Sequence, residues 1–381
     1  MFRLRTGLVA AAALAATAGF ATPAFATPAF ASPASPGTGP AGAVFVQTDN
    51  TAGNQVVAYQ RAANGTLTRA SVYSTGGRGG VLAGSMVDHL ASQGSLQYDQ
   101  QRSLLFAVNA GSNTVSVFGV RGDRLALRQI VPSGGSFPVS VAVRGDLVYV
   151  LNALNGGSVQ GYRVFGGSLV PLPGSSRALG LNPTETPQFT STPGQVAFTP
   201  DGTRLIVTTK NNGNDIDVFT VGFGGWLSRS PVVNAEPGTV PFGITYDEFG
   251  HLVIAEAGPN AVETFSLARD GIVSPVQQAT DGQAATCWVA AAGPYLFAGN
   301  AGSGTESGYA TAGGELALIG NTATDAGTVD ASATPGGQFL YVQTGAAGIV
   351  DEFSVGAGGA LTPLGSVTVP SAAGGEGIVA S

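Results

Sequence analysis

Two charged residues, Lys210 and Glu256, stand at matching positions of a repeated sequence pattern and could act together on a carbonyl group. Lys210 is the only lysine of the 381-residue chain, in which arginine supplies every other positive side-chain charge. A partly buried glutamate can act as a general base, and a nearby cation can stabilise a tetrahedral oxyanion. The pair therefore predicts attack of water on a polarised carbonyl. The other interpretation is a structural ion pair between two neighbouring units.

Six further polar residues are expected to bind substrate at the same place. Four of them stand, within one residue, at the end of the second strand of a unit, as Lys210 and Glu256 do. The other two lie at the starts of innermost strands. In chain order the six are Gln93, Asn109, Asn152, Gln195, Asn300 and Thr344.

His89 is the third catalytic candidate, because it is the only histidine expected near these residues; it is either a general base or a solvated loop residue. Cys287 is the single cysteine, so no internal disulfide can form. Without a histidine to activate it, Cys287 is better interpreted as a small buried apolar residue than as a nucleophile. The chain has two histidines, no phosphate-binding glycine loop and no Gly-x-Ser-x-Gly motif, so we expect neither a metal nor a cofactor.

A sequence unit that recurs seven times must position these residues. In Leu104–Leu125, two runs of β-branched and aromatic residues flank a Gly/Asn turn, which is typical of a β-hairpin. A Gly-x-Leu-like restart adds a third strand, and a short apolar run between copies adds a fourth. The copies begin at Val44, Leu104, Leu147, Leu205, Leu252, Leu296 and Leu340. Four strands at a period of roughly 40 to 50 residues predict an all-β, seven-bladed β-propeller.

The ends of the repeat predict how the ring closes. The first copy has no innermost strand before it, whereas the chain finishes with the run Glu376–Ala380. We expect this C-terminal strand to complete the first blade, because an open ring would leave unpaired strand edges. Two connections, Gly76–Gln93 and Gly174–Thr192, are longer than the repeat requires. Both are expected on the face where the second strands end, the mouth of the central channel, and they are candidate lids.

The N-terminal residues are expected to direct secretion rather than to join the fold. Two arginines precede the apolar run Gly7–Ala21, and small-x-small cleavage sites end at Ala26 and Ala31, so residues 1–31 are predicted to be a signal peptide. Residues 32–42 are rich in Ser, Pro and Gly and are predicted to be a disordered lead-in. The protein is therefore expected to be extracellular.

Residues 43–381 are predicted to be one propeller domain, because no shift in composition divides them. No apolar run after the signal reaches the roughly 20 residues that a membrane-spanning helix needs. The net charge of −7 disfavours nucleic acids and anionic membranes as partners. We expect a monomer.

The segment Phe106–Phe118, together with Thr199–Gly202 and the Gly-x-Leu restarts, resembles the lactonase family of seven-bladed propellers. This family includes a bacterial phosphogluconolactonase and the fungal carboxymuconate cyclase. The resemblance extends over the whole chain after the signal peptide and implies a small-molecule lactone or carbohydrate-derived ligand. It is more specific for fold than for chemistry, because propellers of many functions share such repeats.

The resemblance also implies where catalytic residues would stand, and this chain differs there. The family's enzymes place histidines and an arginine at the starts of inner strands and a glutamate after a second strand. The corresponding positions hold Ser92-Gln93-Gly94, Gly194-Gln195 and Lys210. The family's histidine, arginine and glutamate are thus replaced, and whether the chain is an enzyme stays open from its sequence.

Two functions from different classes remain. The first is a secreted lactonase-like hydrolase that uses the polar residues at the mouth. The second is a non-catalytic extracellular propeller that binds a glycan, a peptide or a protein partner with the same ring and the two long loops. A deep, narrow, polar-lined pocket would favour the enzyme, and a flat apolar patch across several blades would favour a protein partner.

Overall fold

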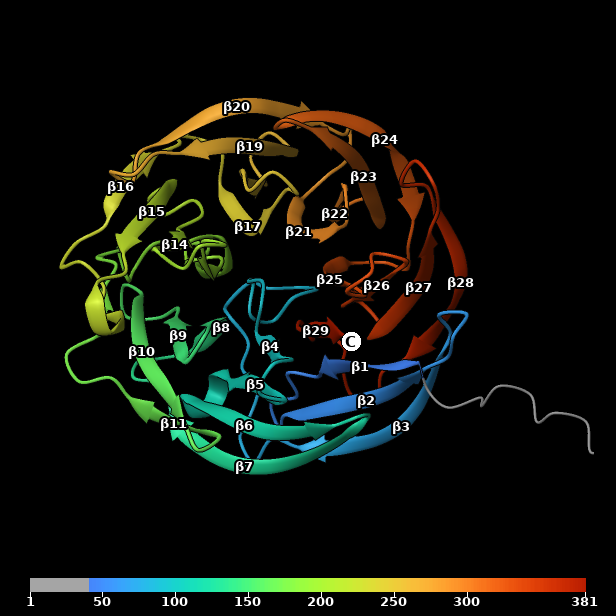
Figure 1. Cartoon of the computed structure of the whole chain (residues 1–381), viewed down its shortest axis with the longest axis horizontal. Helices are drawn as coiled ribbons and strands as arrows, with labels where there is room; N and C mark the ends of the chain where they lie inside the picture. Colours follow the sequence, from blue (N-terminus) through green and yellow to red (C-terminus); the bar gives the residue numbers. More distant parts are fainter. Residues whose placement is uncertain (1–40) are drawn as a thin grey trace, which may run out of the picture. The chain divides into compact units, whose positions relative to one another are not determined.

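The computed structural model describes residues 41–381, which form seven antiparallel β-sheets arranged in a ring (Figure 1). The predicted signal peptide and most of the predicted lead-in lie outside the described residues. Each sheet is one blade, and its strands follow one another from the centre of the ring to its rim. The predicted all-β, seven-bladed propeller is therefore confirmed.

Blades 1 to 3 hold the first strands of the chain and its last one. Blade 1 contains β29 (Ile378–Ala380), β1 (Gly42–Gln47), β2 (Gln55–Arg61) and β3 (Leu67–Ser74). Blade 2 contains β4 (Leu96–Asp99), β5 (Leu104–Asn109), β6 (Thr114–Arg121) and β7 (Arg124–Pro132). Blade 3 contains β8 (Pro138–Arg144), β9 (Leu147–Asn152), β10 (Ser158–Phe165) and β11 (Ser168–Pro171), with the short β12 (Arg177–Ala178) paired to β10.

Blades 4 to 7 have four strands each. Blade 4 contains β13 (Val196–Phe198), β14 (Arg204–Thr208), β15 (Asp215–Thr220) and β16 (Val232–Ala235), and blade 5 contains β17 (Pro241–Tyr246), β18 (Leu252–Glu256), β19 (Ala261–Leu267) and β20 (Val273–Thr280). Blade 6 contains β21 (Thr286–Ala292), β22 (Tyr295–Asn300), β23 (Thr305–Ala312) and β24 (Glu315–Ala323), and blade 7 contains β25 (Thr328–Ala333), β26 (Phe339–Thr344), β27 (Ile349–Val355) and β28 (Leu361–Thr368). The short 3₁₀ turns are η1 (Ala110–Ser112), η2 (Gln188–Thr190) and η3 (Phe223–Gly225).

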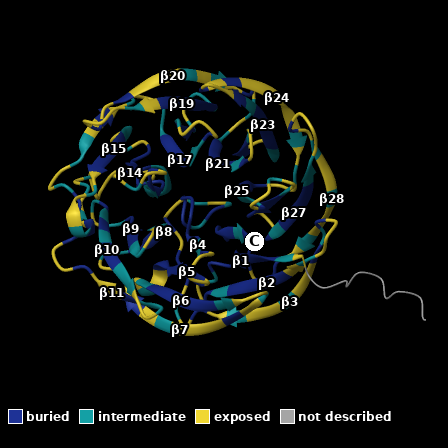
Figure 2. Ribbon diagram, in the orientation of Figure 1, coloured by how far each residue is buried: buried dark blue, intermediate teal, exposed yellow. Residues whose placement is uncertain are grey.

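Burial follows the position of a strand within its blade. Every residue of the second strand β5 is buried, because both faces of this strand pack against neighbouring blades. The rim strand β7 instead exposes most of its side chains, and only Leu125 and Val131 are buried. Figure 2 shows the same gradient in every blade, from buried strands near the centre to exposed strands at the rim. The hydrophobic core therefore lies between blades, as in a ring whose repeats contact only their neighbours.

The ring closes as the sequence predicts. β29 pairs antiparallel with β1, with Phe45 opposite Val379. Buried polar groups hold this last strand from two sides: the Asp330 carboxylate accepts a hydrogen bond from the Ile378 amide (3.4 Å), and the Asp49 carboxylate accepts one from the Glu376 amide (3.0 Å). No sheet edge is left open at the join, which removes a site of edge-to-edge pairing.

In several blades, an asparagine in the turn between the second and third strands forms a hydrogen bond to the next blade. Asn113, Asn214 and Asn260 adopt positive φ values of 55°, 56° and 54°, which asparagine tolerates better than most residues. The side-chain oxygen of Asn214 accepts a hydrogen bond from the amide of Val240 (3.1 Å), and Asn260 binds the Ala285 amide in the same way (2.7 Å). These bonds fix the start of the next innermost strand and so shape the mouth.

Candidate functional site

The connection from β3 to β4 crosses the centre of the ring (Figure 1). The Gln93 side chain makes two hydrogen bonds to the backbone of Val289 in blade 6: its amide donates to the carbonyl (2.8 Å) and its oxygen accepts from the amide (3.0 Å). The Trp288 indole donates to the Ser92 carbonyl (2.7 Å). The connection that leads into blade 2 is thus hydrogen-bonded to blade 6, on the opposite side of the ring. It interrupts the central channel where it crosses.

A cavity of about 320 Å³ remains beside this crossing, at the mouth above blades 4, 5 and 6. Its walls are mainly apolar, and the long connection before β4 and the turn η2 contribute to them. Three side chains in the lining carry groups able to react or ionise: Lys210, Asp88 and Cys287. The apolar walls are Met86, Val87, Ala91, Phe189, Val240, Phe242, Ala257, Ala285, Trp288 and Ala301.

Lys210 is buried in the wall of this cavity, with 1% of its surface exposed. Its ammonium group donates hydrogen bonds to the carbonyls of Ala91 and Phe189 (2.6 Å each) and to the Thr192 hydroxyl (3.1 Å), and it lies 5.1 Å from the centre of the Phe242 ring. Burial lowers the pKa of Lys210 to about 7, although the negative charge of Asp88 opposes this shift. The side chain therefore joins both predicted lid loops, and its ammonium group carries a positive charge below about pH 7.

Asp88, which was not among the residues predicted from the sequence, is the acidic group that the structure brings near Lys210. Its two carboxylate oxygens accept hydrogen bonds from the amides of Leu90 and Ser92 (2.8 Å each). Burial raises the pKa of Asp88 to about 6, while these backbone hydrogen bonds and the charge of Lys210 lower it. A carboxylate whose pKa lies close to neutrality and that lines a cavity can accept a proton from water. The one sequence feature that could have identified Asp88 as a site residue is its position next to His89 in a long connection.

Cys287 is part of the lining of the cavity and is buried. Burial raises the pKa of its thiol to about 12, although Lys210 opposes this shift. The protonated thiol is a poor nucleophile at neutral pH, which agrees with the interpretation of Cys287 as a small buried residue. Beside it, Trp288 and Phe242 pack with ring centres 5.0 Å apart and form the apolar floor.

Glu256 does not pair with Lys210: no ion pair joins them within residues 41–381. Glu256 is fully buried inside blade 5, where one oxygen accepts a hydrogen bond from the Gln278 amide (2.7 Å), and it is not in the lining of the cavity. Burial raises the pKa of Glu256 to about 9, and the nearby charge of Glu263 adds to this shift. The expected cooperation of Lys210 and Glu256 in one site is therefore not supported by their positions.

The predicted substrate-binding asparagines are buried and engaged within the protein. The Asn109 amide donates to the hydroxyls of Thr114 (3.1 Å) and Ser116 (2.8 Å) on the next strand, and Asn300 repeats this arrangement in blade 6. The Asn152 amide donates to the Ser133 carbonyl (3.3 Å). Asn109 and Asn300 thus stabilise the hairpins in which they lie, whereas Asn152 holds the connection between β7 and β8.

The remaining predicted residues are also absent from the lining of the cavity. The Gln195 side chain accepts a hydrogen bond from the Ile244 amide, and the Thr344 hydroxyl donates to the Ile349 carbonyl (3.3 Å). His89 is half-buried against Gly374, whose carbonyl accepts a hydrogen bond from the His89 amide (2.8 Å). Burial lowers the pKa of His89, so its imidazole is neutral at pH 7. Of the nine predicted site residues, Lys210 alone lines the cavity.

No cation site accompanies these groups. Within residues 41–381, no three His, Cys, Asp or Glu side chains are grouped so that they could hold a metal ion. In the same part of the chain, no helix is long and apolar enough to traverse a lipid bilayer.

The Lys210→Met variant is expected to loosen the two loops that Lys210 joins. Methionine fills similar space but leaves the carbonyls of Ala91 and Phe189 without a donor, and each hydrogen bond from a charged group is worth about 1.5–3 kcal/mol. Amides of residues 82–93 and 188–192 should then exchange with deuterium at least about tenfold faster, measured by mass spectrometry. Arg124→Met, at an exposed site on blade 2, is the control. Unchanged exchange in both loops would show that Lys210 does not hold them.

Comparisons with known proteins agree with this architecture. A family model described as lactonase, 7-bladed beta-propeller, matches residues 56–374. No curated protein matches the chain. Among solved structures, a candidate 6-phosphogluconolactonase from Bacteroides uniformis is 18% identical with a TM-score of 0.72, over 89% of this chain and 99% of that one. The periplasmic gluconolactonase PpgL from Pseudomonas aeruginosa is 19% identical with a TM-score of 0.68, over 89% of this chain and 98% of that one.

These structural similarities are distant in sequence and establish the fold, whereas the family model covers most of the chain. The match begins in β2 and ends just before β29, so it includes blades 2 to 7 and the two outer strands of blade 1. It also includes the cavity-lining residues Asp88, Lys210 and Cys287. The chain therefore belongs to the lactonase family of seven-bladed β-propellers.

Proposed function

We propose that this protein is a secreted lactonase that hydrolyses lactones with an apolar substituent in the cavity above blades 4 to 6. The observation that carries the proposal is the lining of this cavity. Apolar walls surround Asp88 and Lys210, two buried groups of opposite charge whose pKa values lie near neutrality. A concave apolar site with a few converging polar groups is the usual form of a small-molecule site.

The proposed mechanism gives Asp88 the role of general base. Asp88 takes a proton from a water molecule as the water oxygen attacks the lactone carbonyl. The positive charge of Lys210 stabilises the oxyanion that develops, through its field, because its three N–H groups are already donated to Ala91, Phe189 and Thr192. The ring C–O bond then breaks, and the leaving alkoxide takes up the proton that Asp88 accepted from water, so that the product is a hydroxy acid and Asp88 is again a carboxylate.

The substrate class follows from what the cavity offers. Lys210 is the only cation in its lining, and all three of its N–H groups are engaged, so a phosphate group would find no free positive partner there. Phe242, Trp288 and Phe189 instead offer apolar surface for an alkyl or aryl group. The periplasmic gluconolactonase among the structural neighbours supports lactone hydrolysis outside the cytoplasm.

A panel of lactones tests this proposal. We expect the purified domain to hydrolyse γ- and δ-lactones with alkyl chains at least about tenfold more efficiently than gluconolactone or its 6-phosphate, because each buried CH₂ group contributes about 0.8 kcal/mol. The measurement is kcat/KM from the acid released, followed with a pH indicator. A preference for the phosphorylated sugar would overturn the substrate class. Binding of alkyl lactones without release of acid would favour the non-catalytic binding propeller instead.

The pH profile of hydrolysis is expected to be bell-shaped and narrow. Below about pH 6 Asp88 becomes protonated and cannot accept a proton, whereas above about pH 7 Lys210 loses the charge that stabilises the oxyanion. Activity should therefore rise with pH through the first value and fall through the second. The check is kcat/KM between pH 4.5 and 9, after subtraction of spontaneous hydrolysis. A steady increase up to pH 9 would rule out a role for the Lys210 charge.

A further inference from the structure

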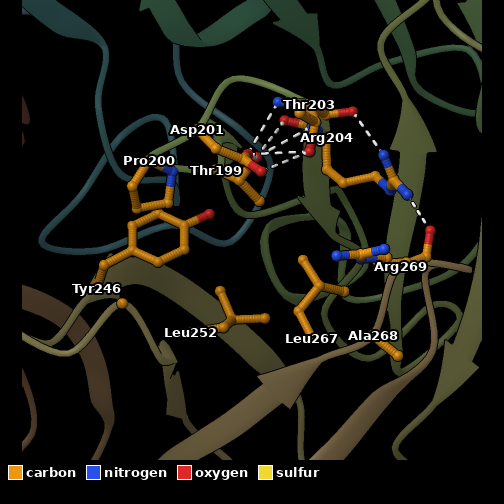
Figure 3. A pocket seen from close by; sticks show the side chains of 11 residues that line it. Thr199, Pro200, Asp201, Thr203, Arg204, Tyr246, Leu252, Leu267, Ala268 and Arg269 are labelled. Carbon is orange, nitrogen blue, oxygen red and sulfur yellow. Dashed lines mark hydrogen bonds between the residues drawn. The ribbon is translucent and has the colours of Figure 1, made fainter.

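A second pocket opens between blades 4 and 5 at the end of the ring opposite the mouth. It is lined by the turn from β13 to β14, by the start of β18 and by the end of β19, and its volume is about 300 Å³. Second strands begin at this end, whereas the cavity with Lys210 lies where they finish. The two pockets are thus separate in the fold. Figure 3 shows the side chains that surround the second one.

Two buried polar atoms in this lining lack a hydrogen-bond partner. The Tyr246 hydroxyl is buried and makes no hydrogen bond, and in Figure 3 it points into the space beside Thr199 and Asp201. The Arg204 Nε is buried and unpartnered as well, although its two terminal nitrogens donate to the carbonyls of Thr203 and Arg269. Buried polar groups are nearly always satisfied in folded proteins, so two such groups in one pocket point to a ligand.

The chemistry of the lining selects the ligand's charge. Arg204 and Arg269 contribute two positive charges, and Asp201 contributes one negative charge. Asp201 is already satisfied, because it accepts hydrogen bonds from the Thr199 hydroxyl (2.7 Å) and from the amide and hydroxyl of Thr203. The groups that remain free are the Arg204 Nε–H, the Tyr246 hydroxyl and the exposed Arg269 guanidinium, so the ligand must offer acceptors and, by charge, one negative group.

The rest of the lining selects the ligand's body. Pro200, Leu252, Leu267 and Ala268 form the apolar part of the wall. We propose that this pocket binds a small organic monocarboxylate, with its carboxylate at Arg204 and Tyr246 and a short apolar body against Leu252 and Leu267. The protein as a whole is acidic, with a net charge of −7, so a locally positive pocket of this kind is a specific feature rather than part of a general basic surface.

Calorimetric titration with benzoate and hexanoate tests the site, with benzamide and hexanamide as neutral probes. We expect both carboxylates to bind one site, and both amides to bind at least about tenfold more weakly, because a hydrogen bond to a charged group is roughly twice as strong as a neutral one. Tyr246→Phe removes only an unpartnered hydroxyl, so the variant should fold normally and bind benzoate at least about tenfold more weakly. Arg204→Gln should weaken binding at least as much.

Three controls separate this pocket from the mouth. Arg229→Gln changes an exposed arginine outside the pocket, and Asp88→Asn and Lys210→Met change the other cavity; all three should bind benzoate as the unmodified protein does. Two results would overturn the proposal: no benzoate binding at millimolar concentration, or binding that Lys210→Met abolishes and Tyr246→Phe leaves intact. Because the proposed site does not use Asp88, loss of lactonase activity in Asp88→Asn leaves the result of this titration unaffected.

Discussion

The Asp88→Asn variant is expected to lose about 10²–10³-fold in kcat/KM for an alkyl lactone, nearly all of it in kcat, because general-base catalysis contributes about 10²–10⁴-fold. Asparagine has the same shape as aspartate, and its oxygen can still accept a hydrogen bond from the Leu90 amide. The amide nitrogen cannot accept the bond from Ser92, so one contact of the loop is lost together with the base. The apolar walls that bind the substrate stay in place, and KM should change little.

A purely structural role for Asp88 would give a different result. The pH profile and the KM of the variant distinguish this role from that of a general base. If Asp88 is the base, the acidic limb of the pH profile near pH 6 should disappear from the residual activity of Asp88→Asn. If the substitution only disturbs the loop, that limb should remain and KM should rise. Asp270→Asn, an exposed aspartate at the opposite end of the ring, is the matched control and should keep full activity. An Asp88→Asn variant as active as this control would remove Asp88 from the mechanism.

The fold could be predicted from the sequence because its signal is repeated. Each hairpin carries the same alternation of β-branched and aromatic residues, so seven weak signals at one period reinforce one another. The closing strand could be predicted for a related reason: an incomplete first copy required a partner strand, and Glu376–Ala380 was the one run not yet assigned. The seven-bladed fold and its closing strand both depend on which strands pair, and the pattern of apolar residues predicts where those strands lie.

The candidate site could be predicted only in part, because aligning the repeats of the sequence does not show whether matching residues have the same backbone conformation. Glu256 is the last residue of β18. Lys210 aligns with it but lies two residues beyond the end of β14, with a φ of 53°. A residue in the left-handed region directs its side chain differently from a strand residue. Lys210 therefore reaches the two loops, whereas Glu256 stays inside its blade. Asp88 was missed because a non-repeating loop carries no periodic signal.

The stability of the fold is expected to fall as the pH rises from about 5 to 9, the reverse of the usual behaviour of carboxylates in ion pairs. Burial raises the pKa of Asp49 to about 8 and that of Glu256 to about 9, and it raises the pKa of Glu306 well above its ordinary value. In the unfolded chain these groups ionise near pH 4. Between the two sets of values the folded protein binds more protons than the unfolded one, so each group lowers the free energy of unfolding by about 1.4 kcal/mol per pH unit.

Glu306→Gln isolates one of these groups. Both carboxylate oxygens of Glu306 are buried without a hydrogen-bond partner, and burial raises the pKa of this group well above its ordinary value, so the folded protein favours the neutral form, whereas glutamine is neutral at every pH. In urea denaturation the variant should unfold at a similar urea concentration to the unmodified protein at pH 5 and at a higher one at pH 9. Glu315→Gln, at an exposed site on β24, should leave the pH dependence unchanged. A free energy of unfolding that rises between pH 5 and 9 would mean that these carboxyls ionise inside the folded ring, and water or a cation would then have to reach them.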